Sequence, residues 1–478
     1  MKSNKSAYKN VIYSMMGVVF NTIIPIIVFP YVTRVLGVDG IGKYSFYSSA
    51  LTYAALFTGY GIALYGAREI GKCADNLQLR SQKFAELMVF NLITVAISAF
   101  LVVYFAFFSS YSDDSVIILL FSLTLLTNAI GGEWFFVGIE MQGFMLVRNI
   151  IIKTLSTIMI FLLVKEPEHL TRYVAITTFS LAGSSLTNIY YWIKLTDLKL
   201  VAKLKLRSYI RPLSSIFSIE VLLRYLGLGD VVILGVLAGD NAVGIYSMGL
   251  KVFLLVSSIL KVTATTLMPR SAYYFENNDA DGFDRLLRNT LRMLILVGLP
   301  ISSGLYLFAE PVILLLGGAE FEGSVGLMKE MSFFLLLSVL VNTYVFQALY
   351  PQNKTKSIIW AHIAGLVISV ALNFALVPYF LCHGTFVAFA LSNIAIAVVL
   401  IAMNKKLFVS TFRVKDYYAY IASTLGACAA TYFSMWLLND SYWLISVVVF
   451  MITYSVLLLI QKDEMFMNIL TSIKRSRK

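Results

Sequence analysis

Charged residues are scarce in this chain. Only 13% of its 478 residues are Asp, Glu, Lys or Arg, whereas 59% are hydrophobic and the mean hydropathy is +0.80. A soluble domain has about a quarter of charged residues, so this composition excludes a soluble globular protein. The apolar residues form long runs, and residues 11–32 and 87–112 contain no charge. Each run exceeds the roughly 20 residues that a helix needs to cross a bilayer core, which indicates an integral membrane protein.

Cysteine and histidine are also rare, with three residues of each type. All six are isolated in the sequence, at Cys73, Cys382, Cys428, His169, His362 and His383. Their spacing excludes a disulfide framework and gives no metal-site pattern, so we expect surface or packing roles for the histidines. A Walker A loop is absent as well, which argues against an ATP-driven pump. We therefore expect no cofactor and no metal.

The long apolar runs predict an all-α polytopic membrane protein. They lack the period-2 alternation of an outer-membrane barrel, so the spans are expected to be helices. We expect fourteen, or twelve if the last pair is not a pair of spans. The predicted spans are 10–34, 44–66, 85–110, 115–138, 147–164, 172–193, 212–238, 244–268, 289–309, 326–350, 356–380, 384–403, 417–438 and 441–460.

Lysine and arginine gather on one side of this predicted topology. The N-terminus, the connections 68–83, 194–211 and 405–415, and the tail 474–478 are basic. The opposite connections contain only Arg34, Lys43, Lys165, Arg172 and Lys329. The positive-inside rule therefore predicts a multi-pass membrane protein with both termini in the cytoplasm. The net charge of +12 follows mostly from this topology, and no nucleic-acid partner is expected.

One short stretch occurs twice. Residues 35–46 read VLGVDGIGKYSF and residues 236–248 read VLAGDNAVGIYSM, and one inserted residue reconciles their Asp and Tyr spacings. The copies are expected between spans 1 and 2 and between spans 7 and 8, on the same outer side. They favour two parallel six-helix lobes related by a pseudo-two-fold axis, an arrangement typical of transporters with alternating access. The alternative is that Gly-rich turns with an interfacial Tyr are common between any two membrane helices.

This repeat suggests four regions: a first six-helix lobe (1–194), a cytoplasmic linker (195–211), a second lobe (212–404), and an extra helix pair with a basic tail (405–478). A membrane glycan polymerase or ligase is disfavoured, because such enzymes normally need a sizeable outer loop and the predicted outer connections are short.

Ionisable side chains inside predicted spans are costly and call for a function. The deep cations are Arg224, Lys251 and Lys261, and Lys153 and Arg292 lie nearer the cytoplasmic face. A hydrated cavity lined by cations suits an anionic substrate such as a diphosphate head group. Two simpler readings remain open: Glu220 could pair with Arg224 one helical turn away, and the two lysines could snorkel outward.

Acids and prolines inside the spans give two further hypotheses. Glu133, Glu220 and Asp230 are candidates for coupling transport to an ion. Pro25 and Pro30 each remove a hydrogen bond from span 1, so a bend there could act as a gate or be a static kink.

Four stretches make the family recognisable. They are GGEWFFVGIEMQGFMLVRNIIIKTLSTIMIFLLVK (131–165), FPYVTRVLGVDGIGKYSF (29–46), GIALYGAREIGK (61–72) and LMPRSAYYF (267–275). The chain resembles the Wzx-type lipid-linked oligosaccharide flippases of the multidrug/oligosaccharidyl-lipid/polysaccharide exporter superfamily. The matching charged and aromatic positions are Arg34, Arg68, Glu133, Trp134, Arg148, Lys153 and Arg270.

The resemblance implies a bilobed bundle in which helices 1, 2, 7 and 8 line a central cationic cavity. It also implies an undecaprenyl-diphosphate-linked oligosaccharide as substrate, carried to the outer leaflet for O-antigen or capsular polysaccharide. Membrane lipids and the polysaccharide polymerase machinery are the implied partners. The candidate substrate-binding residues are Arg34, Arg68, Arg148, Lys153, Arg224, Lys251, Lys261 and Arg270.

Alternatives to these expectations concern the arginines, the class of transporter and the number of spans. Some helix-end arginines could instead anchor the topology or contact anionic lipid. A drug/cation antiporter of the same superfamily is the alternative transporter, but it would need an acidic cavity. Fourteen spans exceed the twelve common among O-antigen members, and the extra pair, residues 417–460, is expected to hold the polyprenyl tail.

Overall fold

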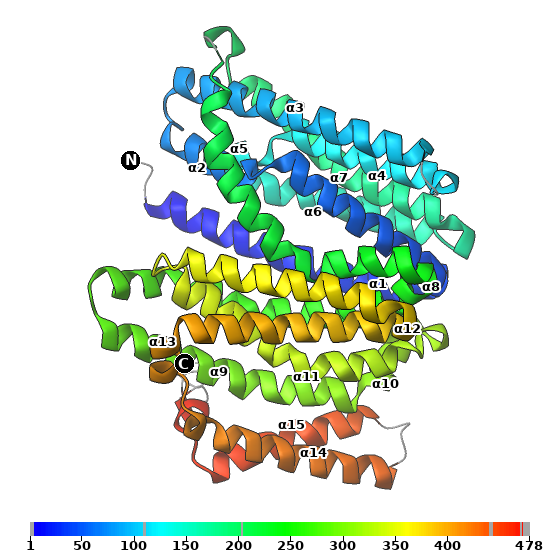
Figure 1. Cartoon of the computed structure of the whole chain (residues 1–478), viewed down its shortest axis with the longest axis vertical. Coiled ribbons are helices and arrows are strands. Elements are labelled where there is room, and N and C mark those ends of the chain that lie inside the picture. The colour runs from blue at the N-terminus through cyan, green and yellow to red at the C-terminus, as the bar shows by residue number, and fades with distance from the viewer. Residues whose placement is uncertain (1–3, 109–110, 202–203, 439–442, 469–470, 472–478) are drawn as a thin grey trace. The chain divides into compact units, whose positions relative to one another are not determined.

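The computed structural model describes residues 4–108, 111–201, 204–438, 443–468 and 471, and it is built of helices joined by short connections (Figure 1). No β-strand occurs in these residues. The chain forms two compact units, unit 1 (Met1–Gly244) and unit 2 (Ile245–Lys478). Their boundary falls inside a helix, whereas the sequence suggested a linker at 195–211. The boundaries predicted for the two six-helix lobes therefore stay a prediction.

The described residues of unit 1 form seven helices and the first part of an eighth. In Figure 1 they run from blue to green. Their bounds are α1 (Asn4–Gly59), α2 (Ile62–Lys72), α3 (Leu77–Phe108), α4 (Ser115–Gly131), α5 (Glu133–Gly138), α6 (Gln142–Leu163), α7 (Leu170–Leu195) and α8 (Arg207–Glu276). Short 3₁₀ turns precede α4, α7 and α8, at Ser112–Asp114, Pro167–His169 and Leu198–Leu200.

Unit 2 contains the rest of α8 and the remaining helices. Their bounds are α9 (Ala280–Leu307), α10 (Ala309–Gly317), α11 (Ser324–Thr343), α12 (Thr355–Met403), α13 (Lys405–Thr411), α14 (Tyr418–Leu438) and α15 (Trp443–Ile460). A π-helix (Tyr344–Leu349) continues α11, and 3₁₀ turns lie at Ala319–Phe321 and Val414–Tyr417.

Three of these helices are too long for one membrane crossing. At 1.5 Å per residue, α1 (56 residues), α8 (70) and α12 (49) each exceed a bilayer core of about 30 Å. Each carries a backbone break: Gly37 in α1, Gly227 and Gly239 in α8, and Leu381 in α12 all have positive φ. The described residues include nine helices long and apolar enough to cross a membrane. The exact total of fourteen spans stays a prediction.

The repeated stretch lies at two of these breaks, and its copies meet within unit 1. Gly37 and Gly239 occupy equivalent places, and the Asn241 amide donates to the Asp39 carboxylate at 2.9 Å, across a separation of 202 residues. This spacing aligns the copies on their glycines without the inserted residue that the sequence comparison assumed. The helices continue directly from each break, so the repeat is a helical break rather than a loop.

Backbone contact between α1 and α8 is close at this crossing. A Cβ atom at Gly42 would overlap the carbonyl oxygen of Asp240, and one at the equivalent Gly244 would overlap that of Val38. The contacts are reciprocal, because Gly42 and Val38 match Gly244 and Asp240 at the same spacing. Only glycine at both positions permits the approach.

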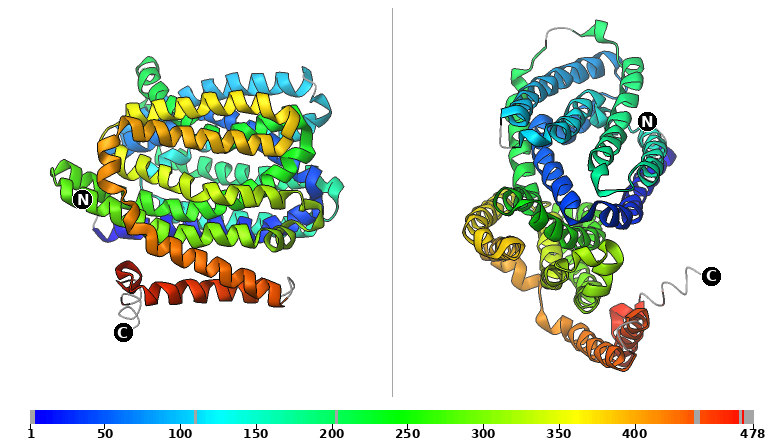
Figure 2. Two further views of the ribbon diagram at one scale, coloured as in Figure 1. Left: turned by 60° about the horizontal axis from the view of Figure 1, so that its bottom comes forward. Right: turned by 90° about the vertical axis from the view of Figure 1, so that its right-hand side faces the viewer.

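The extra helix pair packs inside unit 2. Helices α14 and α15 lie side by side in both views (orange to red, Figure 2), and α14 also packs against α9. The Tyr454 hydroxyl of α15 donates to the Leu296 carbonyl of α9 at 2.7 Å. Arg292 of α9 lies 3.6 Å from the Asp463 carboxylate, just after α15. The predicted pair is thus tied to α9 by both apolar and polar contacts.

Candidate functional site

Close packing against α5 fixes the orientation of α2. The buried residues of α2 are Ile62, Gly66 and Ile70, which recur every four residues and therefore share one face. A Cβ atom at Gly66 would lie 2.7 Å from the Trp134 ring, so glycine lets this indole of α5 approach the helix backbone. Because the buried face is fixed, Arg68 points away from the core.

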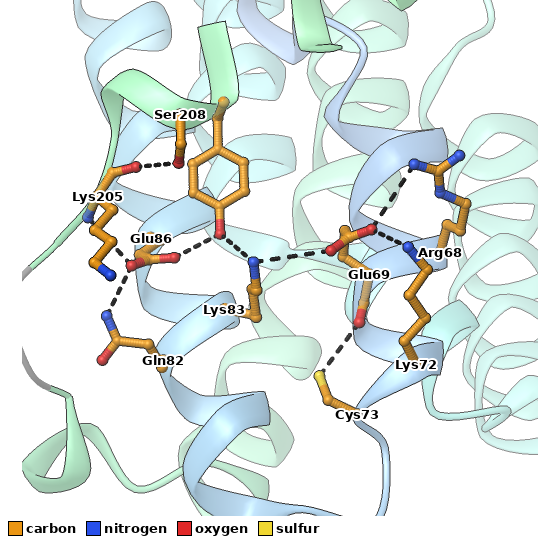
Figure 3. Close-up of polar contacts among 10 residues, drawn as sticks. Arg68, Glu69, Lys72, Cys73, Gln82, Lys83, Glu86, Lys205 and Ser208 are labelled. Carbon is orange, nitrogen blue, oxygen red and sulfur yellow. Dashed lines mark hydrogen bonds and ion pairs between the residues drawn. The ribbon is translucent and has the colours of Figure 1, made fainter. Parts of the chain in front are cut away.

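Three basic side chains converge on one carboxylate at the end of α2. We call Arg68, Glu69, Lys72 and Lys83 the cation cluster; Figure 3 shows Glu69 with Lys83 on one side and Arg68 and Lys72 on the other. The Lys72 ammonium lies 2.6 Å from the Glu69 carboxylate, and Arg68 and Lys83 each lie 3.8 Å from it. The cluster joins α2 to α3, which contributes Lys83.

A buried carboxylate extends this arrangement to the start of α8. The Lys83 ammonium donates to the Tyr209 hydroxyl at 3.0 Å and lies over its ring, and Tyr209 donates to Glu86 at 2.5 Å. Glu86 also accepts from the Gln82 amide at 2.8 Å and from the Lys205 backbone N–H at 3.2 Å. Burial, followed by the Glu86 carboxylate, raises the pKa of the Tyr209 hydroxyl well above its ordinary value.

Two predicted cytoplasmic connections meet around this site. The Arg80 guanidinium donates to the Ala74 carbonyl and to the Leu195 carbonyl, both at 2.6 Å. The Asp197 backbone N–H donates to the Ser81 hydroxyl at 2.9 Å. The connection after α2 and the connection after α7 therefore lie at the same end of unit 1, as the topology prediction requires of two loops on one side of the membrane.

A second polar group joins α5, α6 and α7. The buried Arg148 guanidinium lies 3.1 Å from the Glu133 carboxylate and donates to Asn149 at 2.8 Å and to Asn188. Glu133 itself has a side chain that is 58% exposed. The structure thus brings together two residues that the sequence placed in the family motif, and Arg148 is buried with hydrogen bonds to Glu133, Asn149 and Asn188.

The other predicted residues of unit 1 lie apart from these groups. The Lys153 ammonium donates to Asn21 at 2.7 Å, which links α6 to α1. No ion pair joins Glu220 to Arg224, although both are described residues, and Arg224 is exposed. Asp230 is fully buried and accepts the backbone N–H of Gly227 at 3.1 Å, so it satisfies a donor that the break in α8 releases.

The prolines of span 1 and the break in α1 lie at different places, because Gly37 falls in the connection expected between spans 1 and 2. The backbone of α1 stays helical through Pro25 and Pro30, and its non-helical residue is Gly37. Arg34, three residues before this break, is exposed. The role of the prolines as a gate stays a prediction.

In unit 2 the predicted cations stand along α8. Lys251 and Arg270 are exposed and Lys261 is half-buried. Arg270 donates to the Tyr274 hydroxyl at 3.3 Å and lies over its ring.

Sequence reasoning missed the acids of the first site. Glu69 has Lys72 three residues later, a spacing that favours a helical ion pair and could have been noticed. Glu86 stands directly before the uncharged run 87–112, so it is an acid at the entrance of a span. Its partner Tyr209 is 123 residues away, and no local pattern could have indicated that contact.

Comparisons with known proteins show which family the chain belongs to. A family model described as "Polysaccharide biosynthesis protein" matches residues 7–275, and one described as "Lipid II flippase MurJ" matches residues 215–457. A "Putative O-antigen transporter" of Escherichia coli (strain K12) is 25% identical over 391 residues, which are 80% of this chain and 92% of the relative.

Solved structures show the same fold. "Lipid II flippase MurJ, inward closed conformation" matches with a TM-score of 0.69 at 14% identity, covering 95% of this chain and 99% of that one. A crystal structure of MATE in the bent conformation matches at 0.55 with 13% identity, covering 85% and 96%. These matches confirm the prediction of an all-α, two-lobed membrane fold.

The chain is therefore a multi-pass protein of the bacterial inner membrane and a transporter, not an enzyme. The first family model covers more than half of the sequence, from residue 7 to residue 275. It spans both the cation cluster and the Glu133–Arg148 pair. On this evidence the chain belongs to the polysaccharide biosynthesis protein family, as a Wzx-type flippase of the multidrug/oligosaccharidyl-lipid/polysaccharide exporter superfamily.

Proposed function

We propose that this protein moves undecaprenyl-diphosphate-linked oligosaccharide repeat units from the cytoplasmic to the outer leaflet, for O-antigen or capsular polysaccharide. The observation that carries the proposal is the family match over residues 7–275, together with the similarity to an O-antigen transporter over most of both chains. Transport proceeds by alternating access, with both termini in the cytoplasm. The polysaccharide polymerase machinery is the proposed partner that receives the product.

Basic side chains on α8 are the groups proposed to bind the diphosphate. Arg224 and Lys251 are exposed, and Lys261 is half-buried. Arginine can grip a phosphate with two parallel hydrogen bonds, whereas lysine acts as a mobile point charge. Arg34, Lys153 and Arg270 are the further cations assigned to this route, and Glu133, Glu220 and Asp230 remain the candidates for ion coupling.

An apolar cleft beside the extra helix pair is the proposed place for the polyprenyl tail. It has a volume of about 480 Å³ and lies between α9, α11 and α14. Most of its lining is apolar and includes Leu299, Leu336 and Leu425, and its polar lining residues are Ser302, Ser303, Ser332 and Thr424. A long hydrocarbon chain suits such a surface, because burying apolar area in it is favourable by roughly 25 cal/mol per Å².

Reconstituted transport tests the proposal. Proteoliposomes would receive a fluorescent undecaprenyl-diphosphate oligosaccharide, and its arrival in the opposite leaflet would be followed by cleavage with an added, membrane-impermeant glycosidase. The expected result is transport that falls by about 100-fold or more when Arg224, Lys251 and Lys261 are all changed to Gln, because three phosphate contacts of about 1–2 kcal/mol each are lost.

The control variant is Lys165→Gln, which removes a cation from the opposite, predicted outer side. Normal transport by the triple variant, in protein that still inserts and purifies as a single species, would show that these cations do not bind substrate. Uptake of a cationic drug in place of the lipid would instead favour the drug/cation antiporter.

A further inference from the structure

The cation cluster carries more positive charge than its carboxylate neutralises. Arg68, Lys72 and Lys83 all face Glu69, and within the described ranges no other Asp or Glu lies within ion-pair distance of these three cations. The four side chains together have a net charge of about +2 at neutral pH. Such an excess favours the binding of an anion that carries more than one negative charge.

Glu69 satisfies only one of its three basic neighbours. The Lys72 ammonium is at hydrogen-bonding distance, 2.6 Å, but the 3.8 Å separations of Arg68 and Lys83 are too long for a hydrogen bond. Arg68 keeps its planar set of donors available, and Lys83 uses one donor on the Tyr209 hydroxyl. A ligand with more oxygen atoms than a carboxylate could bond all three cations.

The three cations of the cluster are more exposed to solvent than the carboxylate of Glu69. The side chains of Arg68 and Lys72 are 65% and 59% exposed, Lys83 is 29% exposed, and Glu69 is only 13% exposed. An approaching anion therefore meets the basic groups first, with the acid behind them. Tyr209 and α2 hold the cations at this end of unit 1, because both are anchored in the core.

We propose that the cation cluster is a docking site for the diphosphate of the lipid-linked substrate, and that Glu69 competes with this diphosphate for the same three cations. The inference rests on the proposed function and adds Lys72 and Lys83 to the residues that select the substrate. The carboxylate keeps the cations gathered and is outcompeted by a diphosphate, which carries at least two negative charges. A singly charged phosphodiester lipid is not expected to displace it.

Substituting Glu69 gives a result whose sign separates docking from a purely structural role. If Glu69 competes with the ligand, Glu69→Gln should bind diphosphate more tightly, by about 3-fold or more, because a competing unit charge is removed. If Glu69 only holds the helices together, the same variant should bind no better and be less stable. The variant Lys72→Gln/Lys83→Gln should weaken binding by about 10-fold.

The experiment uses the full chain in lipid nanodiscs, with undecaprenyl diphosphate as the probe and the dissociation constant as the readout. Lys194→Gln is the matched control, because Lys194 is exposed, lies on the same predicted side of the membrane as the cluster, and contacts Tyr190 instead of the cluster. It should leave binding unchanged. Phosphatidylglycerol is the second ligand, and it should bind weakly and respond little to Glu69→Gln.

Several results would overturn the docking site. Binding of phosphatidylglycerol as tight as that of undecaprenyl diphosphate would make the cluster a general lipid contact. Weaker or unchanged diphosphate binding by Glu69→Gln, in a variant that keeps its thermal midpoint, would show that Glu69 does not compete with the diphosphate. If the unmodified protein transports and binds the probe while all cluster variants behave normally, the docking site fails and the proposed function stands. If the unmodified protein does neither, both fail.

Discussion

At the scale of single residues, the buried carboxylate of Glu86 depends on hydrogen-bond donors from several parts of unit 1. It is 4% exposed and accepts hydrogen bonds from the Tyr209 hydroxyl, the Gln82 amide and the Lys205 backbone N–H. A buried charge is tolerated only when such partners satisfy it. The bonds from Lys205 and Tyr209 tie the start of α8 to α3, and the bond from Gln82 lies within α3.

Glu86→Gln should therefore destabilise the protein. An amide nitrogen would replace one acceptor oxygen and face a donor, with an expected loss of about 1.5–3 kcal/mol because the hydrogen bonds involve a charged group. The measurement is the midpoint of thermal unfolding in detergent. Glu140→Gln, at an exposed acid of the same unit, should leave the midpoint unchanged. Equal midpoints for both variants would mean that Glu86 is not held as described.

The two polar groups differ in how far the sequence could predict them. Glu133 and Arg148 were selected because a family motif contains both, and the structure joins them at 3.1 Å. Glu69 and Glu86 were not selected, because their significance depends on Lys83 and Tyr209, which belong to other helices. Charge type and burial can be read locally, but the partner of a buried charge depends on tertiary packing.

At the scale of helices, uncharged runs predicted the apolar helices well because only a helix satisfies its backbone within a bilayer. The run 87–112 lies largely in α3, and the run 11–32 lies in α1. The form of the breaks in long helices was less predictable than their place. The sequence placed a turn at 35–46, and the structure has a break in a continuing helix there, at Gly37, where a positive φ is needed.

The crossing of α1 and α8 gives a prediction about these helices. Gly42→Ala or Gly244→Ala would place a methyl group on the carbonyl oxygen of Asp240 or Val38, so the helices would have to separate. We expect each variant to lose about 1–3 kcal/mol of stability, the usual cost of overpacking, and to lower transport. Thermal unfolding and the proteoliposome assay measure the two effects.

Gly59→Ala is the matched control for this pair. Gly59 is the last residue of α1, and a Cβ atom there would meet no atom within 4 Å. Alanine should be neutral or slightly stabilising at that position, because it loses less conformational entropy on folding. Stabilities of Gly42→Ala and Gly244→Ala equal to that of Gly59→Ala would contradict the close backbone contact.

At the scale of the whole molecule, the distribution of Lys and Arg predicted which connections lie on the same side, which hydropathy alone does not indicate. The basic connections 68–83 and 194–211 were predicted on one side of the membrane, and hydrogen bonds from Arg80 bring them to one end of unit 1. The repeated stretch was also found correctly, but its register was not. Identity of the two aspartates suggested an insertion, whereas the structure pairs Asp39 with Asn241.

The last prediction concerns the cleft between α9, α11 and α14 and the length of the lipid that it accommodates. Ser303→Trp should fill much of the cleft of about 480 Å³. If a polyprenyl tail lies there, this variant should bind undecaprenyl diphosphate about 10-fold less tightly, because about two methylene groups at about 0.8 kcal/mol each lose their contacts. Binding of the short farnesyl diphosphate, whose tail need not reach the cleft, should be unchanged.

Leu437→Trp is the control, since it adds the same ring to an exposed position of α14 away from the cleft lining. It should bind both lipids normally. Equal weakening of both lipids by Ser303→Trp would indicate a general disturbance of unit 2. Normal binding of the long lipid by a stable Ser303→Trp protein would exclude the cleft as the tail site. The contacts of the extra helix pair with α9 would then serve the packing of unit 2 and not the binding of a lipid.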